Sequence, residues 1–227
     1  MNGVFVTGTD TNVGKTYVAC ALARRARDRG HKVFAFKPIE TGCTPTDRGY
    51  LGADQELLAA AAGDWQTGPL RGLYRFPLPA APLVAAQQAG SAIDLDRVER
   101  TARDGAVQAG ATWLLVEGAG GWRVPITPDA DMAVLARRLQ LPVLVVARAG
   151  LGTINHSLLT LEAVERDGLP VAALVLSRRE TDDPAVAESN LAQIQRRWAG
   201  RILILSADLL VLDRLLPAAS QTSGSPS

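Results

Sequence analysis

A lysine and a threonine, Lys15 and Thr16, follow a glycine near the start of the chain, at the end of the run VTGTDTNVGKT. A Gly-Lys-Thr sequence at a helix start suits phosphate binding, because Gly14 removes the side chain where backbone N–H groups approach phosphate oxygens. The Lys15 ammonium can reach the β- and γ-phosphates of a nucleotide, and the Thr16 hydroxyl can ligate Mg²⁺. The alternative is an ordinary strand–turn–helix whose Gly-Lys pair binds nothing.

The spacing of this loop departs from the common phosphate-binding pattern, in which four residues separate the first glycine from the Gly-Lys pair. Here five residues, TDTNV, separate Gly8 from Gly14. The flanking sequence still meets the structural demand of the motif, because residues 4–6 suit a buried strand and residues 17–29 an amphipathic helix. We therefore interpret the segment as a lengthened phosphate loop.

Two further polar residues, Lys37 and Thr41, follow the strand predicted at residues 33–36. A lysine at a strand end can neutralise the charge of a transferring phosphoryl group or of an anionic substrate. The Thr41 hydroxyl can hydrogen-bond the same group. The structural alternatives are a solvated lysine and a turn hydroxyl that bonds its own backbone.

Two carboxylates complete the candidate site. Glu117 comes directly after the strand predicted at residues 112–116, and Asp54 comes just before a predicted helix. Mg²⁺ is typically held by one or two carboxylates together with phosphate oxygens and waters, so Thr16, Asp54 and Glu117 are candidate magnesium ligands. Asp54 has an alternative role as a helix cap.

Glycine-rich turns follow two of the predicted strands. Gly118, Gly120 and Gly121 can let a ligand approach the backbone closely. The turn 150–156 opens a helix whose free N–H groups can bind a carboxylate, unless it is an ordinary connection. We interpret His156 as a surface or packing residue.

Strands and helices alternate along the chain. Apolar runs predict strands at 4–6, 33–36, 112–116, 143–147, 171–176 and 202–205. Helices are predicted at 17–29, 55–62, 82–89, 94–109, 132–139, 154–166, 184–198 and 207–216, with residues 38–54 and 63–81 as loop or irregular structure. This order favours an α/β fold: a doubly wound, mainly parallel sheet with helices on both faces, like that of P-loop NTPases. Ligands of such sheets bind beyond the carboxyl ends of the strands.

The bulk properties are those of a soluble enzyme or switch. The 227 residues suit one domain, predicted at 1–217, followed by a small polar tail at 218–227 that we expect to be disordered. A net charge of +1 argues against nucleic acid and acidic lipid as partners. We find neither a signal-peptide pattern nor an apolar run of ~20 residues, so we expect a cytoplasmic protein without membrane association. The two cysteines, Cys20 and Cys43, lack metal-type spacing.

The chain resembles the dethiobiotin synthetase family in the blocks VTGTDTNVGKT, FKPIETG, VEGAGGW, LPVLVV and GTINHSLLT, which span residues 4–161 in family order. The resemblance implies that diaminopelargonate (7,8-diaminononanoate), CO₂ and ATP are converted to dethiobiotin, ADP and phosphate. A carbamate formed on one amine attacks the γ-phosphate, and the second amine closes the ureido ring on the mixed carbamic-phosphoric anhydride. The resemblance also implies Mg²⁺ and a homodimer with sites at the interface.

The resemblance assigns a role to individual residues. Lys37 and Lys15 are implied to be catalytic, and Thr16, Asp54 and Glu117 to serve the metal. The implied nucleotide contacts are Asn12, Val13, Gly14, Lys15, Thr16, Tyr17, Asp54, Glu117, Gly118, Ala119, Gly120, Ser177 and Arg178. The implied substrate contacts are Thr11, Lys37, Thr41 and Gly120, with Leu151, Gly152, Thr153 and Asn155 of the partner subunit.

The sequence departs from the family pattern at three places. Thr41 replaces a serine and keeps the hydroxyl. Ser177 stands where the family usually has an asparagine that reads the adenine amino group, and residues 205–208 replace a proline-containing base loop. These changes predict weaker adenine selectivity than is typical.

Two other functions use a similar phosphate loop. Partitioning ATPases, which act as nucleotide switches, usually carry a second lysine early in the loop, where this chain has Thr9 and Asp10, and they lack the block around Lys37. A glutamine-dependent amidoligase needs an additional glutamine-hydrolysing domain, for which this chain leaves no length.

Overall fold

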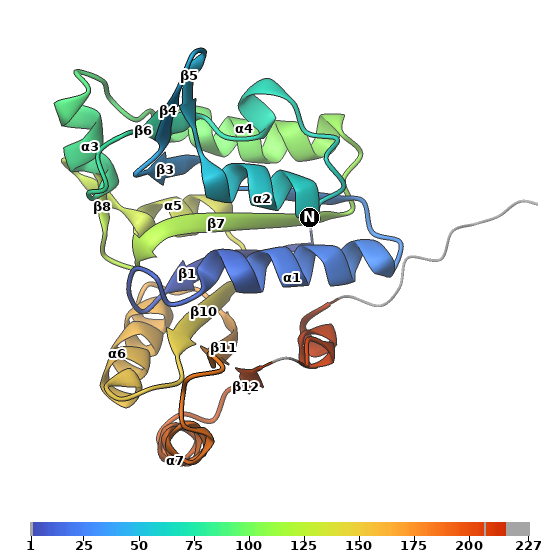
Figure 1. Ribbon diagram of the computed structural model, residues 1–227, viewed down its shortest axis with the longest axis vertical. Coiled ribbons are helices and arrows are strands. Elements are labelled where there is room, and N and C mark those ends of the chain that lie inside the picture. Colours follow the sequence, from blue (N-terminus) through green and yellow to red (C-terminus); the bar gives the residue numbers. More distant parts are fainter. Residues whose placement is uncertain (1, 207, 217–227) are drawn as a thin grey trace, which may run out of the picture.

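The computed structural model describes residues 2–206 and 208–216. Its centre is a six-stranded sheet in which every neighbouring pair is parallel (Figure 1). The strand order is β12 (Ile202–Leu205), β11 (Val171–Ser177), β10 (Val143–Arg148), β1 (Gly3–Gly8), β7 (Trp113–Gly121) and β2 (Val33–Phe36). From β1 the chain crosses to the edge strand β2, returns to β7 between β2 and β1, and then runs outward through β10, β11 and β12 on the other side, which confirms the predicted doubly wound sheet.

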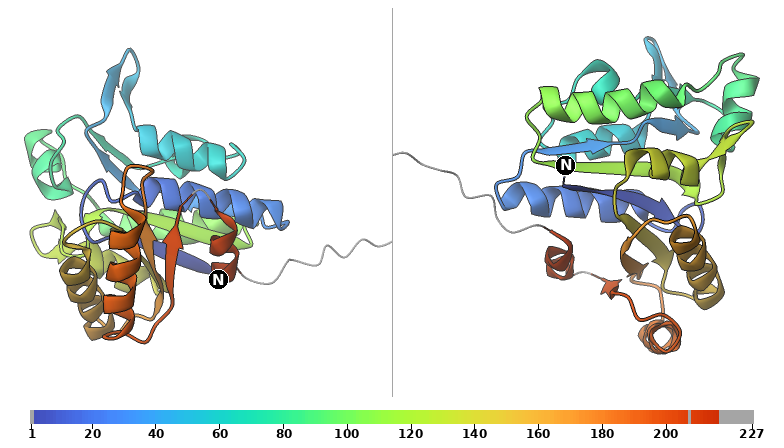
Figure 2. Two further views of the ribbon diagram at one scale, coloured as in Figure 1. Left: turned by 60° about the horizontal axis from the view of Figure 1, so that its bottom comes forward. Right: turned by 180° about the vertical axis from the view of Figure 1, so that it is seen from behind.

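Both faces of the sheet are covered because successive side chains of a strand point to opposite faces. In β1, Phe5 joins one buried cluster, whereas Val4 and Val6 join the other. The cluster of Val4 is closed by α1 (Lys15–Asp28), α2 (Ala53–Ala61) and the 3₁₀ helix η2 (Leu210–Leu215). The cluster of Phe5 is closed by α3 (Pro82–Gln88), α4 (Leu95–Gln108), α5 (Met132–Leu139), α6 (Thr153–Arg166) and α7 (Pro184–Gln195) (Figure 2).

The prediction that residues 38–54 and 63–81 are irregular was wrong in part. They contain β3 (Ile39–Thr41), the hairpin β4 (Thr44–Thr46) and β5 (Gly49–Leu51), the 3₁₀ helix η1 (Gly68–Leu70) and β6 (Tyr74–Phe76). Strands β3 and β6 pair in parallel, with Ile39 opposite Tyr74. Strands as short as β3 and β6 form by pairing with a segment that is distant in the sequence, so local hydrophobic periodicity does not predict them. A second small hairpin, β8 (Pro125–Thr127) and β9 (Ala130–Asp131), was also not predicted.

Most predicted helices are present with ends moved by a few residues. The first helix starts at Lys15, earlier than expected, so Lys15 and Thr16 lie in its first turn. Asp94 caps α4 by accepting a hydrogen bond from the Arg97 N–H. The last predicted helix is the 3₁₀ helix η2, and the tail predicted at 218–227 lies outside the described residues. Among the residues described, no helix is long and apolar enough to span a membrane.

Candidate active site

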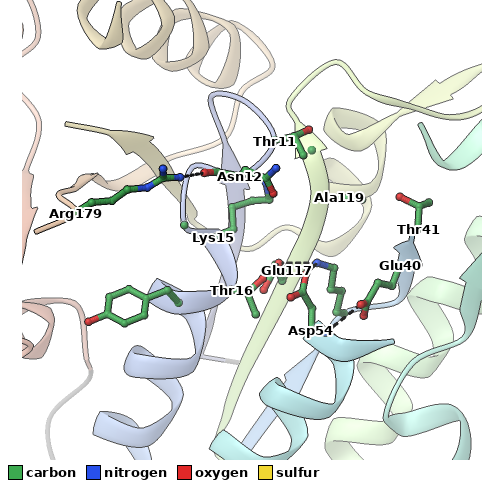
Figure 3. Close-up of a pocket in the computed structure, with 14 residues that line it drawn as sticks. Thr11, Asn12, Lys15, Thr16, Glu40, Thr41, Asp54, Glu117, Ala119 and Arg179 are labelled. Atoms are coloured by element: carbon green, nitrogen blue, oxygen red, sulfur yellow. Dashed lines mark hydrogen bonds and ion pairs between the residues drawn. The ribbon is translucent and has the colours of Figure 1, made fainter. Parts of the chain in front are cut away.

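A cavity of about 520 Å³ opens at the carboxyl ends of β1, β2 and β7 (Figure 3). It lies where open parallel sheets place their ligands. Most of the predicted site residues line it, together with two that the sequence analysis did not select, Glu40 and Arg179. The complete lining is Thr11, Asn12, Gly14, Lys15, Thr16, Tyr17, Lys37, Glu40, Thr41, Asp54, Glu117, Ala119, Gly120 and Arg179.

The phosphate loop presents an uncapped helix start to this cavity. Gly14 precedes α1 with φ 97°, a left-handed conformation that favours glycine, and a Cβ there would lie 2.8 Å from Ser177 Oγ. In the described part of the chain no side chain caps α1, and its first turn carries no acidic residue. The orphan N–H groups and the helix dipole therefore suit an anion.

Lys15 folds back over the loop that contains it. It is only 7% exposed, and its Nζ donates a hydrogen bond to the Asp10 carbonyl at 3.2 Å. Burial lowers the pKa of Lys15, and the nearby Glu117 carboxylate opposes that shift. A phosphate group in the loop would give this ammonium a stronger, charged acceptor than a carbonyl.

Lys37 lies between the two predicted metal carboxylates. Its Nζ donates to Glu117 Oε1 at 2.9 Å and forms an ion pair with Asp54. Lys37 is only 6% exposed, and its partner Glu117 is fully buried. This excludes the alternative that Lys37 is a solvated lysine at a strand end. Burial by itself lowers the pKa of Lys37, but the charges of Glu117 and Asp54 outweigh it and raise the pKa above its ordinary value. The ammonium therefore stays charged.

The strand register brings Lys37 and Glu117 together. Phe36 of β2 pairs with Val116 of β7, so the residues that follow them, Lys37 and Glu117, lie at the same level of the sheet. Thr16 Oγ1 donates to Glu117 Oε1 at 2.8 Å from the first turn of α1. Three elements thus place a hydroxyl, an ammonium and a carboxylate at one point beside the phosphate loop.

One oxygen of Glu117 has no partner. Its Oε2 is buried and accepts no hydrogen bond from any described residue. A buried, unsatisfied carboxylate oxygen is costly unless a cation or another donor reaches it. The oxygen donors of Glu117, Asp54 and Thr16 are the kind that Mg²⁺ takes. In the described residues no group of three His, Cys, Asp or Glu side chains could hold a metal alone, so this set fits a cation that is also ligated by phosphates.

Asp54 is not the cap of α2, as one interpretation of the sequence had it. It is the second residue of the helix, and the capping carboxylate belongs to Glu40 in β3. Burial raises the pKa of Glu40, although hydrogen bonds from the Asp54 and Gln55 amides oppose the shift. No local signal marks Glu40 as a cap, because caps are sought next to their own helix.

A second cavity of about 360 Å³ adjoins the first beyond the phosphate loop. Arg179 lines both cavities and donates to the Asn12 carbonyl at 3.2 Å. The predicted base-reading residues lie here and not in the first cavity. The complete lining is Asn12, Val13, Gly14, Tyr17, Ser177, Arg178, Arg179, Glu180 and Ser206.

The start of α6 does not reach the main cavity of its own chain. Leu151 is 97% exposed, and Leu151 and Thr153 line a separate small recess together with His156. Gly152 has φ 89°, and no side chain of the described residues caps α6. Asn155 is exposed on the same turn. This helix start has the anion-binding features of α1, and its recess is also lined by Thr9, Asp10 and Val13 of the phosphate loop.

Three other residues named in the sequence analysis, Gly118, Cys20 and Cys43, are packed against neighbouring groups in the structure. Gly118 lies outside the linings of both cavities, and a Cβ there would approach the Phe5 ring to 3.1 Å. Cys20 is a buried core residue, and burial raises its pKa to about 11. Cys43 is buried too, and its Sγ donates to the Glu40 carbonyl.

Comparison with known proteins adds a family context. Residues 2–205 match a family model described as "AAA domain". ATP-dependent dethiobiotin synthetase BioD of Anaeromyxobacter dehalogenans (strain 2CP-C) is 47% identical over 86% of this chain and 85% of its own length. The protein of the same name from Cellvibrio japonicus is 42% identical over 85% and 83% of the two chains. That from Xylella fastidiosa (strain 9a5c) is 36% identical over 87% and 86%.

Solved structures support the fold. The MinC:MinD cell division protein complex of Aquifex aeolicus contains a chain with a TM-score of 0.57 and 13% identity, covering 96% of this chain and 87% of that one. The signal recognition particle receptor FtsY of Elizabethkingia anophelis has a TM-score of 0.51 and 14% identity over 94% and 65% of the two chains. At such low identity the likeness concerns the fold alone, that of a P-loop NTPase.

Proposed function

The chain belongs to the ATP-dependent dethiobiotin synthetase family, and on that premise we propose that its phosphate-loop cavity carboxylates 7,8-diaminononanoate and closes the ureido ring. The enzyme is a ligase that uses ATP. The observation that carries the assignment of the site is the contact of Lys37 with both Glu117 and Asp54, directly beside the phosphate loop.

The proposed reaction has three steps. One amine of the substrate adds to CO₂ and loses a proton, giving a carbamate. A carbamate oxygen then attacks the γ-phosphorus of ATP, and ADP leaves. The second amine attacks the carbamoyl carbon of the mixed anhydride, so that the C–N bond of the ring forms and phosphate departs. Two anions, the carbamate and the triphosphate, must therefore be held in line for the second step.

The chain's own residues meet that demand. Lys15 and the N–H groups of α1 hold the triphosphate, as they do in other phosphate loops. Lys37 neutralises charge on the transferring phosphoryl group, because its ammonium is fixed and stays protonated. Thr11, Thr41 and Gly120 line the side of the cavity where the diamine is proposed to bind.

Mg²⁺ is proposed to bind at Thr16, Asp54 and Glu117 together with phosphate oxygens. When bound, it supplies Lewis-acid charge stabilisation at the phosphates. The Oε2 atom of Glu117 supports this assignment, since it is buried and has no hydrogen-bond partner among the described residues.

We further propose a homodimer in which residues 151–155 of one subunit bind the substrate carboxylate held by its partner. The uncapped start of α6 and the full exposure of Leu151 support it. The proposed compartment is the cytoplasm. There the buried, unpaired Cys20 and Cys43 would remain reduced.

The test of this function is ATP hydrolysis measured with and without 7,8-diaminononanoate and bicarbonate. We expect ADP release to depend on both compounds and dethiobiotin to form in equal amount. A basal ATPase that neither compound changes would favour a nucleotide switch, and would contradict the proposal.

Base selectivity provides a second prediction. The second cavity offers hydroxyls and arginines at Ser177, Ser206 and Arg178 in place of an amide that pairs with adenine. We therefore expect kcat/KM for CTP and GTP to lie within about tenfold of that for ATP. The reason is that a hydrogen bond from such an amide to adenine, which is missing here, would favour ATP by roughly 1 kcal/mol. A nucleotide panel at fixed Mg²⁺ measures this, and a strong preference for ATP would disprove it.

A further inference from the structure

We propose that Glu40 is a positioning residue for this reaction: its carboxylate holds the first turn of α2 in the place from which Asp54 reaches Lys37. The inference rests on the proposed function, because it assigns Asp54 to the metal site. It adds a residue of the cavity lining whose role is exerted through Asp54.

Both oxygens of Glu40 are used at the helix start. Oε1 accepts from the Asp54 N–H at 3.0 Å, and Oε2 accepts from the Gln55 N–H at 2.9 Å. These are the donors that an N-cap side chain usually satisfies. The residue at the N-cap is Gly52, which has no side chain. The Glu40 carboxylate, which comes from β3, caps the helix in its place. Figure 3 shows Glu40 directly beside Asp54.

Gly52 leaves room for this carboxylate. A Cβ at Gly52 would lie 2.7 Å from Glu40 Oε2 and 2.9 Å from Gln55 Oε1. The backbone angles of Gly52, φ −92° and ψ 103°, are open to any residue. Glycine is therefore required there by space and not by conformation, and the space is that of the Glu40 carboxylate.

Gln55 fixes the same turn from its other side. The residue is fully buried, and its Nε2 donates to the Lys37 carbonyl at 3.0 Å and to the Tyr74 carbonyl at 3.3 Å. The first turn of α2 is thus bonded to the backbone of Lys37 and to the side chain of Glu40. Because Asp54 lies between these attachments, the turn places its carboxylate where it forms the ion pair with the Lys37 ammonium.

A carboxylate accepts the two N–H groups of Asp54 and Gln55 better than an amide does. Glu40→Gln keeps the size of the side chain but turns an NH₂ toward a backbone N–H, so one of the two hydrogen bonds is lost. Partners that orient a metal ligand typically contribute 10- to 100-fold to metal affinity or activity. We therefore expect Glu40→Gln to weaken cation binding by about tenfold and to lower kcat.

The experiment measures Mn²⁺ binding by electron paramagnetic resonance, with the full-length protein holding the non-hydrolysable nucleotide AMP-PNP. Mn²⁺ replaces Mg²⁺ as the probe, and no turnover is needed. The control is Glu56→Gln, which changes a carboxylate on the same turn that pairs with Arg71 instead. We expect Glu40→Gln to raise the Kd of Mn²⁺ and Glu56→Gln to leave it unchanged.

Gly52→Ala tests the same contact without removing a charge. Its methyl group displaces the Glu40 carboxylate, so we expect weaker Mn²⁺ binding in the native background. In a Glu40→Ala background the same change should have a smaller effect, because the Glu40 carboxylate is gone and only the contact with Gln55 Oε1 remains. A Glu40→Ala/Gly52→Ser variant should recover part of the affinity, since serine is a good N-cap.

Two outcomes would overturn the inference. The first is a Glu40→Gln variant that is less heat-stable but binds Mn²⁺ as the Glu56→Gln control does, which would make Glu40 a helix cap only. The second is additivity of Glu40→Ala and Gly52→Ala. Asp54→Asn is measured beside them. If it leaves Mn²⁺ binding unchanged, the metal assignment of the proposed function fails; if it alone weakens binding, only the inference fails.

Discussion

Replacement of Lys37 with alanine is expected to lower kcat by about 10²- to 10³-fold while nucleotide binding stays largely intact. The ammonium is held by Glu117 and Asp54 at the end of β2, where the phosphoryl group is proposed to transfer. The triphosphate is held elsewhere, by Lys15 and the start of α1. Loss of Lys37 therefore removes an interaction of the transition state more than one of the ground state.

Steady-state kinetics and a separate nucleotide titration measure these two effects. The control is Lys32→Ala, which removes an exposed lysine that stacks on Trp65 at the opposite end of the same strand. Circular dichroism must accompany the kinetics, because the variant leaves buried Glu117 without its cation, a change that can cost about 3–5 kcal/mol of stability. A folded Lys37→Ala enzyme with unchanged kcat and a raised KM would contradict the proposed role.

Glu117→Gln is expected to weaken Mg²⁺ binding by about 10- to 100-fold and to lower turnover at limiting Mg²⁺. The amide preserves the shape of the side chain, so its oxygen can still accept from Thr16 and Lys37 in the place of Oε1. What changes is the unpaired Oε2, which becomes an NH₂ group and cannot ligate a cation. The substitution therefore tests that one oxygen.

The measurement is the Mg²⁺ dependence of kcat at saturating ATP. Glu188→Gln makes the same chemical change at an exposed position in α7, and we expect it to have no effect. If the titration curves of Glu117→Gln and the unaltered enzyme coincide, Glu117 does not belong to the metal shell.

Much of the site can be predicted from sequence because its parts are contiguous. The phosphate loop, from Gly8 to Thr16, joins the end of one strand to the start of one helix through one turn. Neighbouring residues in the sequence specify each of these parts. Lys37 and Glu117 follow apolar runs that mark buried strands. Since the carboxyl ends of parallel strands lie at one edge of the sheet, the edge that these residues share follows from the alternation of strands and helices.

The rest depends on contacts that no local pattern encodes. The pairing of Phe36 with Val116 brings together two side chains that are far apart in the chain, and a shift by one residue would turn one of them to the other face. Glu40 caps a helix from another strand, and that strand forms only because β6 pairs with it. Arg179 reaches the phosphate loop from the loop after β11.

The sequence by itself thus determined which residues are proposed to carry the chemistry and that most of them share one edge of a parallel sheet, because residue type and local periodicity decide both. Only the tertiary structure decided that Lys37 is buried between two carboxylates, that one oxygen of Glu117 is unpaired, and that Asp54 is held by a cap from elsewhere. The physical reason is that burial, register and hydrogen-bond satisfaction depend on which residues pack against each other. The arrangement of the whole sheet decides which residues these are.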